Sequence, residues 1–267
     1  MAHSEPRLPA WYYRVSVAVR KRNGVILWDF DEDISDLDET NQDGETQSYD
    51  GPDAAYYYEL RKKREERKRE LHRRKEHIRK LKEDAREAEL KKQQEVQTAY
   101  EAFEITISSG GKNYLGPLDS QFDLFCLDYF DRFYDPSLHG YQRKYIKFQY
   151  PEGQQEEGRN VLLNGRLWLN PNVDYELGPF SPPEQASLDH FKLKTIDDRF
   201  TLALQFIDKD HLILRISRNL VFMDKPQDAS GPETFIFMGV RNDFGKLLQT
   251  FGRAFAQIRE ASSDQPT

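Results

Sequence analysis

The sequence predicts an α+β protein with three parts: a mainly antiparallel β-sheet body of six to eight strands, two amphipathic helices that cover the sheet, and a long charged helix that projects from it. Residues 53–104 contain no Gly and no Pro and consist largely of strong helix formers. From residue 141 onward, short runs of alternating apolar residues are separated by turn residues, which is typical of antiparallel strands. Residues 122–134 and 242–261 repeat apolar side chains at steps of three and four, which predicts the two covering helices.

The N-terminal residues are rich in β-forming side chains. Residues 11–20 and 25–30 lie on either side of Asn23-Gly24, a pair typical of a tight hairpin turn. Within 13–19 every second residue is Tyr or Val, so one face of the first run is apolar. Because a two-stranded hairpin is marginally stable alone, we expect residues 1–30 to be a hairpin that joins the sheet of the body.

An acidic segment follows the expected hairpin. Residues 29–50 contain ten Asp or Glu, no Lys or Arg, and few apolar side chains. A segment of this composition buries too little apolar surface to offset the entropy lost on ordering it. We therefore expect residues 31–52 to be a disordered acidic linker.

The expected helix at 53–104 is divided by charge. Residues 61–82 include thirteen basic and four acidic side chains, whereas 83–104 include three basic and seven acidic ones. Glu residues that precede a basic residue by four, such as Glu59 before Lys63, each stabilise an isolated helix by roughly 0.2–0.5 kcal/mol. A sparse apolar seam comprises Leu71, Ile78, Leu81, Ala85, Ala88, Val96, Ala99 and Phe103. The pattern favours a single solvated helix, and it leaves open a coiled coil, including a homodimer through 71–103.

The composition from residue 105 to 261 is typical of a globular body. We expect a short strand at 104–109, a hairpin that turns at Asn164-Gly165, and a second clear turn at 208–210. The last residues, 262–267, are polar and are expected to form a disordered tail. The further strands are expected at 141–150, 160–163, 166–169, 174–177, 190–194, 199–207, 211–217, 220–223 and 234–240.

Composition narrows the class of protein. The net charge of −7 and the pI near 5.5 argue against a protein that coats nucleic acid or anionic membrane with its whole surface. The single cysteine, Cys126, excludes an internal disulfide, and no apolar run is long enough to span a bilayer. We therefore expect a soluble intracellular protein of the nucleus or the cytoplasm, with no membrane partner.

The sequence predicts no metal site, no cofactor and no catalytic residues. The six histidines are dispersed, and no glycine-rich phosphate loop occurs. Cys126 lies within an apolar stripe, which favours packing over nucleophilic chemistry.

One short segment resembles an enzyme motif. Residues 25–31, Val-Ile-Leu-Trp-Asp-Phe-Asp, resemble the first motif of haloacid-dehalogenase-like phosphatases, and residues 36–40, Asp-Leu-Asp-Glu-Thr, resemble the form found in the polymerase-tail phosphatases of that family. The resemblance covers about 15 residues. It implies a strand that ends in Asp29, a nucleophilic Asp29, a proton-handling Asp31 and magnesium-dependent phosphate-ester hydrolysis. We hold this phosphatase as a distant alternative.

The basic half of the long helix is the strongest candidate for a functional surface. We expect the protein to be a non-enzymatic intracellular protein–protein interaction protein, with a β-rich binding body and a charged helical arm. The alternative is a nuclear factor that contacts nucleic acid non-specifically through 61–82. The candidate residues for binding a partner protein or nucleic acid are Lys62, Lys63, Arg64, Arg67, Lys68, Arg69, Arg73, Arg74 and Lys75.

Overall fold

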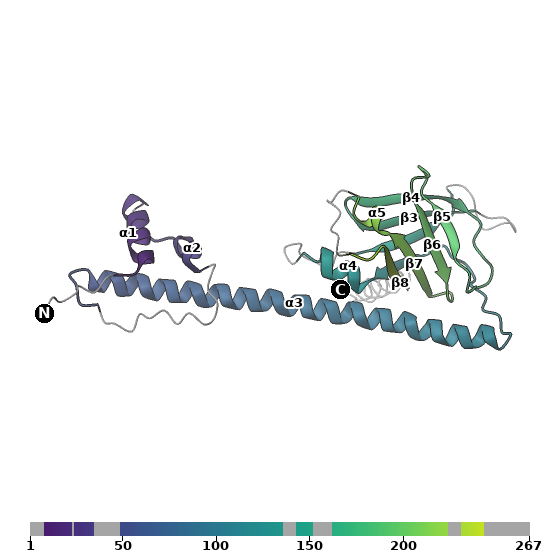
Figure 1. Ribbon diagram of the computed structural model, residues 1–267, viewed down its shortest axis with the longest axis horizontal. Coiled ribbons are helices and arrows are strands. Elements are labelled where there is room, and N and C mark those ends of the chain that lie inside the picture. The colour runs from purple at the N-terminus through teal and green to yellow at the C-terminus, as the bar shows by residue number, and fades with distance from the viewer. Residues whose placement is uncertain are drawn as a thin grey trace, which may run out of the picture. The chain divides into compact units, whose positions relative to one another are not determined.

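The structure is a computed structural model, and it describes residues 8–22, 24–34, 49–135, 143–151, 162–223 and 231–242 (Figure 1). The chain divides into two compact units, Met1–Leu81 and Lys82–Thr267, here called unit 1 and unit 2. The predicted α+β class is confirmed, because an eight-stranded antiparallel sheet is combined with one long helix and several short ones.

All the secondary-structure elements described in unit 1 are helices. It contains α1 (Ala10–Arg22), the 3₁₀ helix η1 (Leu27–Phe30), α2 (Asp31–Ile34) and the first half of α3 (Ala54–Ser108). Figure 1 shows α1 and α2 along the N-terminal part of α3. The buried core of the unit consists of Trp11, Tyr12, Val15, Phe30, Ile34, Tyr57 and Leu60.

The prediction of an N-terminal hairpin is wrong, and no described residue before 121 belongs to the sheet. The side chains that α1 buries are Trp11, Tyr12, Val15 and Ser16, which are spaced as on one face of a helix. The alternation of Tyr and Val over 13–19 is also present, but packing against α3 selects the helical spacing over the β pattern. Residues 31–34 of the expected linker form α2, whereas 35–48 lie outside the described residues.

The long helix α3 contains 55 residues, so the expected helix at 53–104 is present and extends to Ser108. The short strand expected at 104–109 is therefore wrong. Phe103 and Ile107 continue the helical spacing of Val96 and Tyr100, and all four belong to the core of unit 2 or pack against it. Two residues beyond the end of the helix, Gly110 has a φ of 80°, a conformation that is readily available to glycine and common just after helices.

Unit 2 is built on a sheet whose eight strands follow the order β4-β3-β2-β1-β8-β7-β6-β5, all antiparallel. The two edge strands approach each other, because Leu177 and Thr195 form an isolated bridge and Ile196 N donates to Glu176 O at 3.0 Å. The sheet is therefore nearly barrel-shaped. The strands are β1 (Gln121–Phe125), β2 (Tyr145–Gln149), β3 (Leu163–Asn170), β4 (Val173–Phe180), β5 (Phe191–Lys194), β6 (Thr201–Phe206), β7 (His211–Ser217) and β8 (Thr234–Asn242).

The concave face of the sheet holds the main core. Alternate residues of β1, β2, β3 and β8 are buried, as at Phe122 and Leu124 of β1. The turn expected at Asn164-Gly165 is wrong, because both residues lie inside β3. A Cβ atom at Gly165 would lie 2.9 Å from Cδ1 of Leu177, so glycine is needed there for close packing rather than for a turn.

Two further elements differ from expectation. The helix expected at 122–134 is divided into β1 and the shorter helix α4 (Leu127–Phe133), and the strand expected at 220–223 is occupied largely by α5 (Arg218–Val221). Short apolar runs such as these are compatible with a helix and with a strand, so their spacing alone does not determine which one forms. Of the range 242–261 expected to form the second covering helix, Asn242 is the last residue of β8, and 243–261, like the tail at 262–267, lie outside the described residues.

Within the part of the chain that the structure describes, no helix combines the length and the apolar character needed to cross a bilayer.

Candidate binding surface

Of the nine basic residues predicted to form the binding site, two are internal to unit 1. Arg67 is 9% exposed, and its Nε and Nη2 donate to the two carboxylate oxygens of Asp31 at 2.7 and 2.8 Å. Nη1 of the same residue donates to Glu70 Oε2 at 2.9 Å. The hydrogen bonds from Arg67 hold the pKa of Asp31 below its usual value. This paired guanidinium fastens α2 to α3.

Arg64 is the second internal cation. It is 4% exposed, and its guanidinium carbon lies 5.3 Å from the centre of the Trp11 ring. A guanidinium over an indole face is a favourable cation–π arrangement, and burial strengthens it. Arg64 therefore fastens α1 to α3, as Arg67 fastens α2.

The remaining seven predicted residues lie nearer the surface of α3. Lys63 is half-buried and pairs with Glu59 at 2.6 Å, and Lys68 is also half-buried. Exposed residues among them are Lys62, Arg69, Arg73, Arg74 and Lys75. At about 100° per residue, three of these, Lys62, Arg69 and Arg73, lie on one side of the helix.

A fourth exposed cation, Lys80, continues that side, although it was absent from the predicted site. The spacings of seven, four and seven residues between the four cations were readable in the sequence and indicate one helix face. We call Lys62, Arg69, Arg73 and Lys80 the basic stripe.

Unit 1 also exposes large apolar side chains of residues that the sequence predicted to lie in the strands of a hairpin. Trp28 of η1 is 73% exposed and Tyr13 of α1 is 55% exposed. Val17 follows Tyr13 by four residues on the same exposed side of α1. In the predicted hairpin Tyr13 and Val17 belong to the face that packs against the body, but α1 packs through Trp11, Tyr12 and Val15 and leaves both exposed.

The start of α3 is fixed by a carboxylate that accepts two phenol groups. Tyr12 donates to Asp53 Oδ2 at 2.6 Å, and Tyr49 donates to Asp53 Oδ1 at 2.5 Å. Burial, followed by the bond to Asp53, raises the pKa of Tyr12 to about 12, and the bond to Asp53 raises the pKa of Tyr49 to about 12. Both phenols therefore remain protonated donors at neutral pH.

In unit 2 a buried ion pair connects α3 to the sheet. Glu89 of α3 has a fully buried side chain, and its Oε1 lies 2.9 Å from Nζ of Lys144, the residue before β2. The same oxygen accepts the backbone N–H of Cys126 at 2.6 Å, while Gln93 Oε1 accepts that of Leu127 at 3.2 Å. Side chains of α3 therefore satisfy the first backbone donors of α4.

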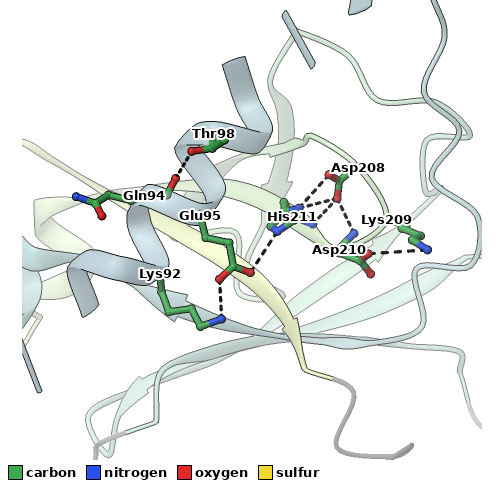
Figure 2. A network of polar contacts seen from close by, with 8 residues as sticks. All are labelled: Lys92, Gln94, Glu95, Thr98, Asp208, Lys209, Asp210 and His211. Carbon is green, nitrogen blue, oxygen red and sulfur yellow. Dashed lines mark hydrogen bonds and ion pairs between the residues drawn. The ribbon is translucent and has the colours of Figure 1, made fainter. Parts of the chain in front are cut away.

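A second polar network lies where α3 meets the turn between β6 and β7 (Figure 2). Nδ1 of His211 lies 2.9 Å from Asp208 Oδ2, and Nε2 lies 3.6 Å from Glu95 Oε1. The bond to Asp208 raises the pKa of His211 above its usual value. The two carboxylates approach opposite nitrogens of one ring, so they do not converge on a point where a metal ion would sit. Among the described residues, no group of three or more His, Cys, Asp or Glu side chains is arranged to hold a metal ion.

The two aspartates to which the phosphatase resemblance assigns catalytic roles are paired with arginines of unit 1. Asp29 lies inside the 3₁₀ helix η1 and not at the end of a strand, as the resemblance implies. Its carboxylate accepts the backbone N–H of Ile26 at 3.1 Å and pairs with Arg22. Asp31 is held by Arg67. Residues 36–40, the second part of the resemblance, lie outside the described residues.

Cys126 is a free, buried cysteine at the start of α4. Burial raises the pKa of its thiol to about 11, so the side chain is a protonated thiol at neutral pH. Its position within the core agrees with the packing role expected from the sequence.

Comparisons of this chain with models of protein families, with curated proteins and with solved structures found no match.

Proposed function

We propose that this chain is a non-enzymatic interaction protein that binds an acidic surface of a partner protein through the basic stripe. The proposal rests on one observation, which is that the cations of α3 fall into a buried set that packs against α1 and α2 and an exposed set. Arg64 and Arg67 hold α1 and α2 against the helix, whereas the stripe cations stay exposed. Packing of α1 and α2 involves α3 residues between 56 and 71, and it orders the part of α3 that carries Lys62 and Arg69 before any partner arrives.

A stiff surface matters for affinity. Long basic side chains lose rotamer freedom on binding, but a helix that is already ordered loses little backbone entropy. Glu65, Glu66 and Glu76 lie among the stripe cations along the helix, so the surface has mixed charge. Mixed charge favours a protein partner, whose own lysines can meet these carboxylates, over a uniformly anionic polymer.

The test replaces the four residues of the basic stripe by Gln in the full chain. Wild-type and variant chains are crosslinked in nuclease-treated lysate of the source cells, and captured proteins are identified by mass spectrometry. We expect a set of acidic proteins that is captured by the wild type and lost from the variant. A control with the same change in net charge replaces Lys112, Lys147, Lys192 and Lys194, which are exposed in unit 2. Identical captured sets for the stripe variant and the wild type would refute the proposal.

The second candidate function is binding of single-stranded nucleic acid. One specific observation favours it: unit 1 carries the exposed aromatic residues Trp28 and Tyr13 in addition to the basic stripe. Proteins that bind single strands combine cations for phosphates with aromatic faces for bases.

The two candidates differ in salt dependence. Nucleic-acid binding weakens with salt by a log–log slope of about 0.7 for each phosphate contact, so losing all four stripe cations would reduce the slope by up to about 3. Trp28→Ala would reduce affinity at every salt concentration, by roughly fivefold or more if a base stacks there. The measurement is fluorescence anisotropy of a labelled oligouridine titrated with the full chain between 50 and 200 mM salt. Absence of binding at the lowest salt would eliminate this candidate and leave the protein-binding proposal standing.

A further inference from the structure

The imidazole of His211 stands between two carboxylates that come from different parts of unit 2. Asp208 belongs to the turn that joins β6 to β7, and both of its oxygens lie within 3.0 Å of Nδ1. Glu95 belongs to α3, and its Oε1 lies 3.6 Å from Nε2 on the other side of the ring. Figure 2 shows the ring between these two side chains. The histidine therefore connects the helix to the sheet.

Protonation of the ring decides whether the contact with Glu95 is attractive. Asp208 Oδ1 already accepts the backbone N–H groups of Asp210 and His211 at 2.7 and 2.8 Å, so this carboxylate is firmly oriented. Its position selects the tautomer with the proton on Nδ1. In the neutral ring Nε2 then carries a lone pair that faces the carboxylate of Glu95. In the imidazolium Nε2 carries a proton, and the same contact becomes an ion pair.

The other charged groups around the ring come from three elements. On α3, Lys92 pairs with Glu95 at 2.7 Å and, as the foremost cause, holds the pKa of Glu95 below its usual value. In the turn, Lys209 and Asp210 lie 3.9 Å apart. On β8, Nη1 of Arg241 donates to the backbone oxygen of Lys209 at 3.2 Å. The cations therefore contact Glu95, Asp210 or the backbone, and the groups placed directly against the imidazole are the carboxylates of Asp208 and Glu95.

We propose that His211 is a pH-responsive clamp that fastens α3 to the turn between β6 and β7 when it is protonated and loosens this contact when it loses its proton. Val96, Phe103 and the buried Glu89 also hold the helix on unit 2. Loss of the proton therefore increases local opening around the clamp without releasing the whole helix.

The direction of the pH effect follows from the raised pKa of His211 in the folded protein. The imidazolium stabilises the folded state fully at pH values below about 6.5, the ordinary pKa of histidine. That stabilisation is lost as the pH rises through the higher folded-state pKa. The equilibrium constant for unfolding of unit 2 changes tenfold for each unit by which the folded pKa exceeds the unfolded one.

The experiment uses the full chain and two readouts. The first is the pKa of His211 from its imidazole NMR signals, assigned with His211→Gln. The second is hydrogen exchange of residues 92–99 and 207–212 between pH 6 and pH 9, corrected for the intrinsic exchange rate. We expect a pKa above 6.5 in the wild type, a lower pKa in Glu95→Gln, and opening that increases with pH in the wild type.

The variants separate the clamp from a general effect of pH. His211→Gln should remove the pH dependence of exchange in both segments, whereas His190→Gln, at an exposed histidine of the same unit, should keep it. Glu95→Gln is a mild change because the Glu95 side chain is 41% exposed, so the fold should persist. The proposal is overturned if Glu95→Gln leaves the titration of His211 unchanged, or if His211→Gln keeps the wild-type pH dependence.

Discussion

Replacing Lys144 by Met should destabilise unit 2 far more than its position just before a short strand implies. The side chains of Glu89 and Lys144 are 0% and 4% exposed, and Nζ lies 2.9 Å from one carboxylate oxygen. Lys144→Met removes the cation and leaves the buried carboxylate of Glu89 without it. Removal of one partner from a buried ion pair costs about 3–5 kcal/mol. For a unit of this size, that corresponds to a decrease in Tm of roughly 6–20 °C.

The double variant shows whether the charge is the cause. Glu89→Gln keeps an oxygen for the N–H of Cys126 but leaves the Lys144 ammonium buried, which should cost about 3 kcal/mol. Combining Glu89→Gln with Lys144→Met removes both charges, so the loss should decrease to about 1–2 kcal/mol. The double variant is therefore expected to be more stable than either single one.

The assay is urea unfolding of the full chain followed by near-UV circular dichroism, with each variant compared with the wild type. Lys147→Met is the matched control, since Lys147 is an exposed lysine of the adjoining strand and should change stability by less than about 0.5 kcal/mol. A loss below about 1 kcal/mol for Lys144→Met would refute the reasoning. So would a double variant whose loss equals the sum of the two single losses.

Three further predictions concern the two units. A fragment 82–267 should unfold cooperatively in urea, whereas 109–267 should not, because the latter lacks the part of α3 that completes the core of unit 2. Trp11→Ala should cost unit 1 about 3–5 kcal/mol in the same assay, whereas Trp28→Ala should cost less than about 0.5 kcal/mol, because Trp11 is buried and Trp28 is exposed. Asp31, whose pKa is lowered in the folded state, should stabilise unit 1 at neutral pH and lose this effect as the pH falls through the lowered pKa. Hydrogen exchange of α1 should therefore rise at acid pH in the wild type, and Asp31→Asn should weaken that pH dependence, with the remainder due to Asp53, whose pKa is lowered by the bonds from Tyr12 and Tyr49.

Sequence reasoning succeeded where one periodicity was unambiguous. In β6 and β7 every second residue is a large apolar one (Leu202, Leu204 and Phe206, then Leu212, Leu214 and Ile216), and a clear turn at 208–210 separates the two runs, so both strands and their antiparallel contact were predicted. The length and composition of α3 gave a similarly clear pattern, because no Gly or Pro interrupts it.

Prediction failed where two periodicities coexist in one segment. In α1 the residues Tyr13 and Val17 fit a strand face, yet Trp11, Tyr12 and Val15 fit a helix face, and only contact with α3 distinguishes the two. In β1 every second side chain is buried, and α4 begins only two residues after this strand ends. The apolar residues of the two elements together show steps of three and four, so the sequence predicted one helix across both. Local sequence cannot separate these outcomes, because the deciding contacts are remote in the chain.

The sequence predicted that basic residues of α3 form the candidate site, but it did not show which of them are exposed and which pack inside unit 1. Arg67 and Arg69 are indistinguishable in a charge pattern, but Arg67 meets Asp31, whereas Arg69 is exposed. To predict which arginines are buried, one would have to know that α2 packs against α3, but the residues of α2 were expected to be disordered. Lys80 was missed for a simpler reason, since it lies beyond the densest clusters although it continues their helix face.

The contacts that α3 makes within each unit partly explain why its two halves differ in charge. In unit 2 the helix contributes Glu89 and Glu95, and their partners on the sheet side are Lys144 and His211. In unit 1 it contributes Arg64 and Arg67, which hold an aromatic ring and a carboxylate. In each half of the helix, residues of the predominant charge therefore help to hold the unit, although in unit 2 the basic Arg86 also pairs with Asp131 of α4 at 2.9 Å. The exposed cations of the basic stripe take no part in these contacts, which supports a binding role for the stripe.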